Sequence, residues 1–552
     1  MHCVQCSTGF TITPEEIRLR ERIASTFETG PVPSPTLCPD CRMQRRMARR
    51  NERTLYRRSC DKSGKKIISV YPEGTPFPVY ERSAWWSDAW DPLSYGRDFN
   101  FNRLFFEQFE ELQKVVPRPA LSATNSENSD YCNFVFDSRN CYLSHNSYYC
   151  DSLLYCYWSM NTKDCIDCNY CFKCERCFEC SDCNHSYNCN HSILSHNCSD
   201  SAYLYDCRGC SYCFGCVGLR QKSYYIFNQQ LTKEEYEIRI KQFDLNNLRH
   251  AKAVEERMEA LEIKHPHLYS IQEKTEECTG DYIFESKNCQ SCFQIYRSQD
   301  CMYVQDAETK DALDCYHPGW NQATYECYSP VRQTSTAFCS LCWDGSDNFY
   351  SDNCHSCSYC FGCIGLRHKK YCILNKQYSK EKYKRTMARI VARMKETKEW
   401  GEFFPVTLSP FAYNESMAQE YYPLSKTEVQ KRGWAWRDPA PFTPGNSSIS
   451  WDKIPQAIQE VPDTILNEVL SCTVCKKSYK IIQQEFQFYR QNQVAIPREC
   501  PECRYKRRAA LHNARKLYSR ACAKCSSQIQ TTYSTDRPEI VYCEHCYLKT
   551  VY

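Results

Sequence analysis

This chain of 552 residues has little glycine, a small net charge and no long apolar run. Only 16 residues are glycine, and the formal net charge is +4, so the overall charge points to no particular partner. No run reaches the roughly 18 apolar residues that a membrane-spanning helix needs. The chain also lacks a P-loop, a dinucleotide fingerprint, a nucleophile elbow and a His-Glu-x-x-His helix. We therefore expect no enzyme, no membrane partner and no small-molecule substrate.

Cysteine, in contrast, is abundant, with 43 residues. The chain begins Met1-His2-Cys3 without an apolar signal region, which favours a cytoplasmic location. Because that compartment is reducing, a disulfide framework of this size is not expected. The odd number of cysteines agrees with this interpretation.

Twelve of the cysteines form three quartets of C-x-x-C pairs near the two ends of the chain. The quartets are Cys3, Cys6, Cys38 and Cys41; Cys472, Cys475, Cys500 and Cys503; and Cys522, Cys525, Cys543 and Cys546. Each C-x-x-C turn presents two sulfurs to one point, and the spacer brings the second pair to it, which suits tetrahedral Zn²⁺. We expect about three structural zinc ions per chain, with disulfides or uncoordinated thiols as the alternative.

The two ends of the chain are copies of each other. Cys38-Pro39-Asp40-Cys41-Arg42 returns 462 residues later as Cys500-Pro501-Glu502-Cys503-Arg504. In the first copy, the last quartet is reduced to a single cysteine. Cys60 matches Cys522, but Ser63, Glu81 and Ala84 occupy the positions of Cys525, Cys543 and Cys546. A single ligand does not hold zinc, so the first copy is expected to carry one zinc site and the second copy two.

A resemblance follows from the motifs at the C-terminal end. Cys472-Thr-Val-Cys475, Glu485-Phe486-Gln487-Phe488-Tyr489 and Arg498-Glu499-Cys500 resemble the small "probable zinc-ribbon" (treble-clef-like) zinc-binding family. The match covers about 35 residues there and, more weakly, residues 1–45. The whole arrangement is similar to uncharacterised bacterial proteins with such ribbons at both ends and Cys-rich repeats between them. The resemblance implies zinc binding and no known reaction.

Arginines follow the second C-x-x-C pair of both copies. They are Arg42, Arg45, Arg46, Arg49, Arg50 and Arg53 in the first copy and Arg504, Arg507, Arg508 and Arg515 in the second. On one continuous helix their spacing puts them on one face. Such a face repels itself unless it meets an anion, so we expect it to bind nucleic acid, with RNA favoured. The alternatives are an acidic protein partner or acidic surface of the same chain, or a solvated face.

In the middle of the chain, cysteines recur at multiples of three. From Cys132 to Cys216 every interval between the 17 cysteines is such a multiple. Neither a helix nor a strand has this period, but a triangular solenoid returns an inward position at fixed intervals. The cysteines then form a buried ladder; extra zinc or other metal, or an iron-sulfur cluster in the run Cys165–Cys183, are the alternatives. His185, His191 and His196 fit polar turn positions in this region.

The Cys-rich region is itself duplicated. Cys207–Arg220 returns 147 residues later as Cys354–Arg367, and each copy leads into a charged helix, at about 232–262 and 379–398. The predicted fold is therefore multidomain and mainly β with helices: zinc ribbons at both ends flank two Cys-rich β-solenoids, each capped by a helix. The domains are 1–84, a ribbon and its decayed partner; 85–121, an aromatic connector; 122–265 and 270–400, the solenoids; 401–466, a Pro-rich connector; and 467–552, tandem ribbons.

The leading functional hypothesis is a non-enzymatic zinc protein that binds nucleic acid through its arginine helices. A protein-protein assembly scaffold is the second hypothesis. A redox or metal-handling protein that uses the central cysteines is the third.

Overall fold

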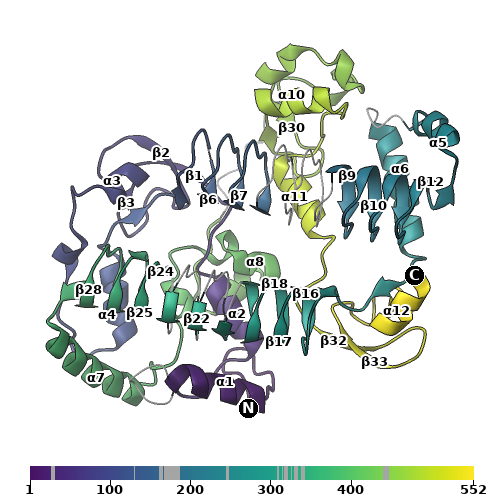
Figure 1. Ribbon diagram of the computed structural model, residues 1–552. Helices are drawn as coiled ribbons and strands as arrows, with labels where there is room; N and C mark the ends of the chain where they lie inside the picture. The colour runs from purple at the N-terminus through teal and green to yellow at the C-terminus, as the bar shows by residue number, and fades with distance from the viewer. Residues whose placement is uncertain are drawn as a thin grey trace.

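The computed structural model describes residues 1–25, 32–129, 131–160, 166, 187–243, 248–307, 310–313, 315, 321–324, 326–327, 333–336, 342–438 and 447–552. Two stacks of short, mostly parallel strands form the middle of this multidomain protein, and the ends of the chain form small modules that carry the cysteine quartets (Figure 1). We call these parts solenoid 1 (122–230), solenoid 2 (270–377), the N-terminal module (1–84) and the C-terminal module (467–552). Among the described residues, every helix is too short or too polar to cross a membrane.

Solenoid 1 repeats every twelve residues. Its strands are β5 (Ala123–Thr124), β6 (Asn133–Phe136), β7 (His145–Tyr148), β8 (Tyr157–Met160), β9 (Tyr187–Ile193), β10 (Ser199–Tyr205), β11 (Ser211–Val217), β12 (Ser223–Ile226) and the antiparallel β13 (Gln229–Gln230). Asn133 pairs with His145, and His145 pairs with Tyr157. Each coil therefore adds one strand to the stack, as predicted for a solenoid.

The cross-section of the coil differs from the prediction. Every third residue is left-handed: φ is 57° at Tyr131, 56° at Phe134, 50° at Asp137 and 56° at Asn140. A left-handed residue turns the chain, so a coil of twelve residues has four sides of three residues each. The expected triangle is therefore wrong. Glycine is scarce because Asn, Asp and aromatic residues take these positions, at a conformational cost that the stacked neighbours offset.

The residue after each left-handed position points into the coil. Cys132, Cys141 and Cys150 take this place and are 1–3% exposed. Their thiols donate to nearby carbonyls, as Cys150 Sγ does to the Tyr148 carbonyl at 3.1 Å. Burial raises the pKa of Cys141 to about 12, which keeps its thiol neutral. The described cysteines of solenoid 1 thus form a buried ladder, while the cysteines of the run from Cys165 to Cys183 lie outside the described residues.

Solenoid 2 has the same construction. One sheet contains β15 (Gln272–Glu273), β16 (Gly280–Phe284), β18 (Cys292–Tyr296) and β20 (Gln305–Ala307). The larger sheet contains β17 (Lys287–Gln290), β19 (Gln299–Met302), β21 (Lys310–Ala312), β22 (Asn321–Thr324), β23 (Gln333–Thr336), β25 (Ser346–Phe349), β27 (Ser358–Phe361), β28 (Lys370–Ile373) and β29 (Lys376–Gln377), and β24 (Cys342–Trp343) pairs with β26 (Cys354–His355). Gln299 pairs with Lys310 after eleven residues instead of twelve, so the period slips by one residue between β19 and β21.

Each solenoid ends in the same closing device. The side-chain amide of Asn228 donates to the Val217 carbonyl and accepts from the Val217 N–H, both at 2.8 Å. Asn375 does the same to Ile364, also at 2.8 Å. Because the amide imitates a further strand, it satisfies part of the last coil's open edge.

Helices follow these edges. Helix α7 (Lys380–Glu396) begins after the Ser379 cap as predicted. The other predicted helix is divided into α5 (Lys233–Ile240), which begins with a capping box formed by Thr232 and Glu235, and α6 (Leu248–Glu262).

From their second C-x-x-C pair onward, the terminal modules repeat each other element by element. The N-terminal module contains α1 (Pro14–Ser25), α2 (Pro39–Met47), β1 (Tyr56–Ser59), β2 (Lys66–Ser69), β3 (Val79–Tyr80) and α3 (Arg82–Trp86). The C-terminal module contains β30 (Leu470–Ser471), β31 (Ser478–Tyr479), α10 (Gln483–Gln491), α11 (Pro501–Ala509), β32 (Tyr518–Ala521), β33 (Gln528–Thr531), β34 (Val541–Tyr542) and α12 (Glu544–Val551). The elements from α2 to α3 begin 462 residues before those from α11 to α12, as the sequence duplication predicts.

The two connectors pack against the body of the protein. They contain η1 (Pro92–Tyr95), α4 (Phe105–Gln113), β4 (Arg118–Pro119), η2 (Val406–Leu408), η3 (Tyr413–Glu415), α8 (Met417–Tyr421), α9 (Lys426–Lys431), η4 (Trp451–Lys453), η5 (Ile458–Glu460) and η6 (Asp463–Asn467). Phe109 and Phe404, one from each connector, are fully buried with ring centroids 4.8 Å apart. Trp85, Trp90, Phe99, Phe105 and Phe109 of the first connector belong to the same core, while Trp86 is exposed.

Each terminal module is linked to one solenoid by a strand pair and contacts the other solenoid through its helices. In the N-terminal module, β3 pairs with β4, which leads into solenoid 1, while α1 and α2 reach solenoid 2. In the C-terminal module, β34 pairs with β14 (His267–Leu268), which leads into solenoid 2, while α11 lies against solenoid 1 (Figure 1). Each end of the chain therefore joins both solenoids.

Candidate metal centres

The three predicted quartets come together in the structure. Within each quartet, the four Sγ atoms all lie within 4.8 Å of one another, and no other group of this kind occurs in the described residues. The Sγ–Sγ distances are 3.7 Å for Cys6–Cys38, 3.6 Å for Cys475–Cys500 and 3.7 Å for Cys525–Cys543. A tetrahedron with Zn–S bonds of 2.3 Å has edges of about 3.8 Å. The quartets therefore fit a tetrahedral, thiolate-bound metal ion, and zinc fits this donor set.

Local backbone structure positions each pair of sulfurs. The residue after the second cysteine of a knuckle is left-handed, with φ of 61° at Ser7, 62° at Lys476 and 61° at Ser526. The N–H of that residue bonds back to the carbonyl of the first cysteine, at 2.9 Å for Ser7 and Cys3. This tight turn aims both sulfurs at one point.

In the quartets that contain Cys38 and Cys500, the second C-x-x-C pair lies at the start of a helix. Cys38 and Cys500 are the N-caps of α2 and α11, and a proline follows each of them at the first helical position. A hydrogen bond from the Cys41 thiol lowers the pKa of Cys38 to about 5. The positive end of the helix also favours thiolates, the form that a metal ion needs.

The decayed fourth site keeps its shape without its ligands. The N–H of Glu81 donates to Cys60 Sγ at 3.2 Å, as the N–H of Cys543 does to Cys522 Sγ at 3.3 Å. Gly64, with φ of 72°, closes the turn over Cys60. The fold of the intact quartet is therefore retained where only one cysteine remains.

The predicted arginine face is not on the surface. Helix α2 ends at Met47, so the expected continuous helix from Arg42 to Arg53 is wrong. Arg42, Arg46, Arg49 and Arg50 are at most 2% exposed. A helix with residues buried all round cannot present one arginine face to a large partner.

Carboxylates of the same chain surround these arginines. The measured pairs are Arg42–Glu16 at 3.0 Å, Arg45–Glu326 at 2.9 Å, Arg45–Glu402 at 2.7 Å, Arg49–Asp352 at 3.5 Å and Arg53–Glu502 at 2.5 Å, and Arg50 pairs with Glu52. Glu326 and Asp352 belong to solenoid 2. Of the alternatives to nucleic acid as the partner of the arginines, this arrangement matches an acidic surface of the same chain.

The C-terminal arginines are divided between the interior and the surface. Arg504 is buried, pairs with Glu485 at 3.3 Å and lies 5.1 Å from the Tyr155 ring of solenoid 1. Arg508 is 1% exposed. Arg507 pairs with Glu499 at 3.3 Å and keeps 43% of its side chain exposed, and Arg515 lies over the Tyr421 ring at 4.3 Å.

Sequence reasoning missed the partners of the arginines. Glu326, Asp352 and Glu402 are about 300 residues away from Arg45 and Arg49, and no local motif marks them. The one available signal was that the rest of the chain carries the acidic excess that balances the arginines.

No protein-family model, no curated protein and no solved structure matches the chain. Its metal centres are therefore defined by their own geometry: three groups of four cysteines that could each bind a metal ion.

Proposed function

We propose that the protein is a non-enzymatic zinc-binding scaffold, in which zinc ribbons at both ends of the chain hold the two solenoids together. The convergence of four sulfurs in each quartet supports this proposal most directly. Each quartet is a closed set of four thiolates, which is typical of structural zinc and leaves no open position for a substrate.

The contacts around the quartets suggest what the metal does. In both modules, a quartet fixes the start of a helix whose arginines reach buried carboxylates. In α2, these carboxylates include one of solenoid 2. Zinc at Cys38 and Cys41 would therefore hold Arg42 and Arg45 in the position that their partners require.

Metal analysis of the full chain tests the proposal. We expect protein purified under anaerobic conditions to contain about three zinc ions per chain and to have no visible colour. Cys503→Ser should lower the zinc content by about one ion, because three thiolates bind zinc more weakly than four. Cys60→Ser is the matched control, since this buried cysteine belongs to no quartet, and it should leave the zinc content unchanged. Absence of zinc from the wild-type protein would refute the proposal.

Nucleic-acid binding is the second candidate function, and the exposed cations of the C-terminal module favour it. Lys506 keeps 72% of its side chain exposed and Lys516 is exposed, on the segment that also presents Arg507. These side chains are available for phosphate contacts, with single-stranded RNA as the proposed ligand. An acidic protein would use the same cations.

Salt dependence tests this second function. Lys506→Glu together with Lys516→Glu should weaken binding of a single-stranded RNA and make the slope of log K against log salt shallower by about 1.4, because each lost contact removes ~0.7. Fluorescence anisotropy at salt concentrations from about 50 to about 200 mM measures this slope. Lys252→Glu on α6, a distant exposed lysine, is the control. If the double variant binds RNA as tightly as wild type, this surface is not the binding site.

A further inference from the structure

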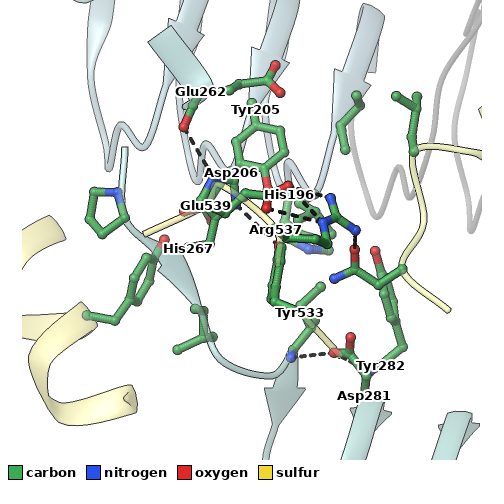
Figure 2. A pocket seen from close by; sticks show the side chains of 18 of the residues that line it. His196, Tyr205, Asp206, Glu262, His267, Asp281, Tyr282, Tyr533, Arg537 and Glu539 are labelled. Atoms are coloured by element: carbon green, nitrogen blue, oxygen red, sulfur yellow. Dashed lines mark hydrogen bonds and ion pairs between the residues drawn. The ribbon is translucent and has the colours of Figure 1, made fainter. Parts of the chain in front are cut away.

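A cavity of about 210 Å³ lies where solenoid 1, the beginning of solenoid 2 and the C-terminal module meet. Tyr205 from β10, His267 from β14 and Tyr533 after β33 turn toward one another on its wall (Figure 2). At ~30 Å³ for each water, the space corresponds to about seven water volumes, which is the size of a small molecule with about ten non-hydrogen atoms.

The central histidine of this wall is neutral and fully engaged. His267 Nδ1 lies 2.8 Å from the Tyr205 hydroxyl and 3.3 Å from the Tyr533 hydroxyl, and Nε2 lies 3.2 Å from the Glu262 carbonyl oxygen. Burial lowers the pKa of His267. The nearer phenol, that of Tyr205, therefore donates to Nδ1, while Nε2 carries the proton and donates to the carbonyl.

The arginines around the cavity are paired with carboxylates of the same chain. The ion pairs are Arg208–Glu273 at 2.7 Å, Arg537–Glu539 at 3.1 Å and Arg220–Asp206 at 3.0 Å. Asp281 accepts hydrogen bonds from Thr532 Oγ1 and from the Ile271 N–H, both at 2.7 Å. Since the lining arginines are already paired with carboxylates and burial raises the pKa of the lining Glu262 to about 7, the cavity favours an uncharged ligand over an anion.

Two buried nitrogens on the cavity wall lack a hydrogen-bond partner within the described part of the chain. They are Nδ1 of His196 and Nε of Arg208, which belong to adjacent coils and whose backbones are paired. Buried polar atoms are almost always hydrogen-bonded, so a molecule that fills the cavity must offer groups to both nitrogens. Because Nε of arginine only donates, that molecule has at least one acceptor.

The duplication provides an internal comparison for this cavity. The corresponding residues in the other half of the protein are Asp352 for Tyr205, Arg118 for His267, Tyr71 for Tyr533, Phe77 for Glu539 and Trp85 for Tyr547. There, Arg118 and Asp352 form a buried ion pair at 2.7 Å, and the Arg118 guanidinium lies 5.1 Å from the Phe77 ring. Trp85 is fully buried.

The two copies thus differ in chemistry at equivalent positions. One copy carries a fixed ion pair and large apolar rings, which suit a purely structural junction. The other copy carries a neutral His–Tyr–Tyr group and smaller or polar residues beside a cavity. Packing of the junction alone does not require that an ion pair and large rings be replaced by this neutral group. The copy with the cavity therefore has the character of a binding site.

We propose that this cavity binds the base of an uncharged nucleoside, a flat nitrogen heterocycle of the size of the cavity, with the ribose outside the cavity. The aromatic rings of Tyr205, Tyr282 and Tyr533 and the apolar side chains of Leu268 and Ile271 provide surfaces for a flat ring. His196 Nδ1 and Arg208 Nε provide edge contacts. This site is separate from the metal centres and from the exposed cations of α11.

Calorimetric titration of the zinc-loaded full chain with adenosine, guanosine, cytidine and uridine tests the proposal, with ribose and glucose as non-aromatic probes. We expect saturable binding of at least one nucleoside and none of the sugars. His196→Ala should weaken this binding at least about tenfold, as expected for one lost hydrogen bond to a buried group. His250→Ala, on α6 and away from the cavity, is the matched histidine control.

A second variant closes the cavity with the residues of the other copy. Glu539→Phe with Tyr547→Trp should abolish nucleoside binding while the zinc content and circular dichroism remain those of wild type. If this variant fails to fold, His196→Ala decides the question. Failure of all four nucleosides to bind, binding of sugars instead, or equal binding by His196→Ala would overturn the proposal. If the cavity holds only water, none of the four nucleosides will bind.

Discussion

Replacement of Asp352 by alanine is expected to destabilise the protein by about 3–5 kcal/mol, because it leaves buried arginines without their carboxylate. Asp352 is 1% exposed and pairs with Arg118 at 2.7 Å and with Arg49 at 3.5 Å. These arginines come from the first connector and from the N-terminal module, so one carboxylate of solenoid 2 holds two other parts of the chain.

Urea unfolding followed by tryptophan fluorescence measures this effect, since Trp85 and Trp90 lie in the neighbouring core. Glu276→Ala is the control, because Glu276 is an exposed carboxylate of the same solenoid at a position that is not left-handed. It should change the free energy of unfolding by less than about 0.5 kcal/mol. A change of the same small size in Asp352→Ala would show that the buried pairs contribute little to holding the module.

Restoration of the decayed site is expected to create a fourth zinc centre. The triple variant Ser63→Cys, Glu81→Cys and Ala84→Cys supplies three thiols beside Cys60, in a backbone that keeps the hydrogen bonds of the intact quartet. The zinc content should rise from about three to about four per chain, and the apparent binding free energy of such a centre is typically about 10–16 kcal/mol.

Metal analysis and a chelator titration measure the gain. The matched control carries Ser63→Ala and Glu81→Ala, which change the same positions without adding thiols. A zinc content that stays at the wild-type value in the triple variant would mean that Cys60 and its neighbours no longer have the geometry of a ligand set.

Short-range spacing made the quartets and the solenoids predictable. A C-x-x-C turn fixes the direction of both sulfurs within four residues, so Cys472 and Cys475 identify their own geometry. The inward period of three is also local, since it follows from one left-handed residue in every three. The number of sides of a coil is different: it depends on which strands pair, and only the register of Asn133 with His145 reveals it.

Long-range pairing explains what the sequence could not predict. The spacing of Arg42, Arg45 and Arg49 is the same whether they face phosphate or carboxylate. Their partners lie in α1, in solenoid 2 and after α7, and no nearby residue identifies them. The binding cavity was missed for the same reason, because His196, His267 and Tyr533 come from three separate parts of the chain.

The crossing of the two ends between the solenoids has a consequence during synthesis on the ribosome. Arg45 emerges early, but its partners Glu326 and Glu402 follow 281 and 357 residues later. At ~5–20 residues per second, the nascent N-terminal module waits roughly 15–60 s with its arginines exposed to solvent. Throughout this interval the growing polypeptide carries a cationic segment that anions in the cell can reach, and the finished molecule encloses it.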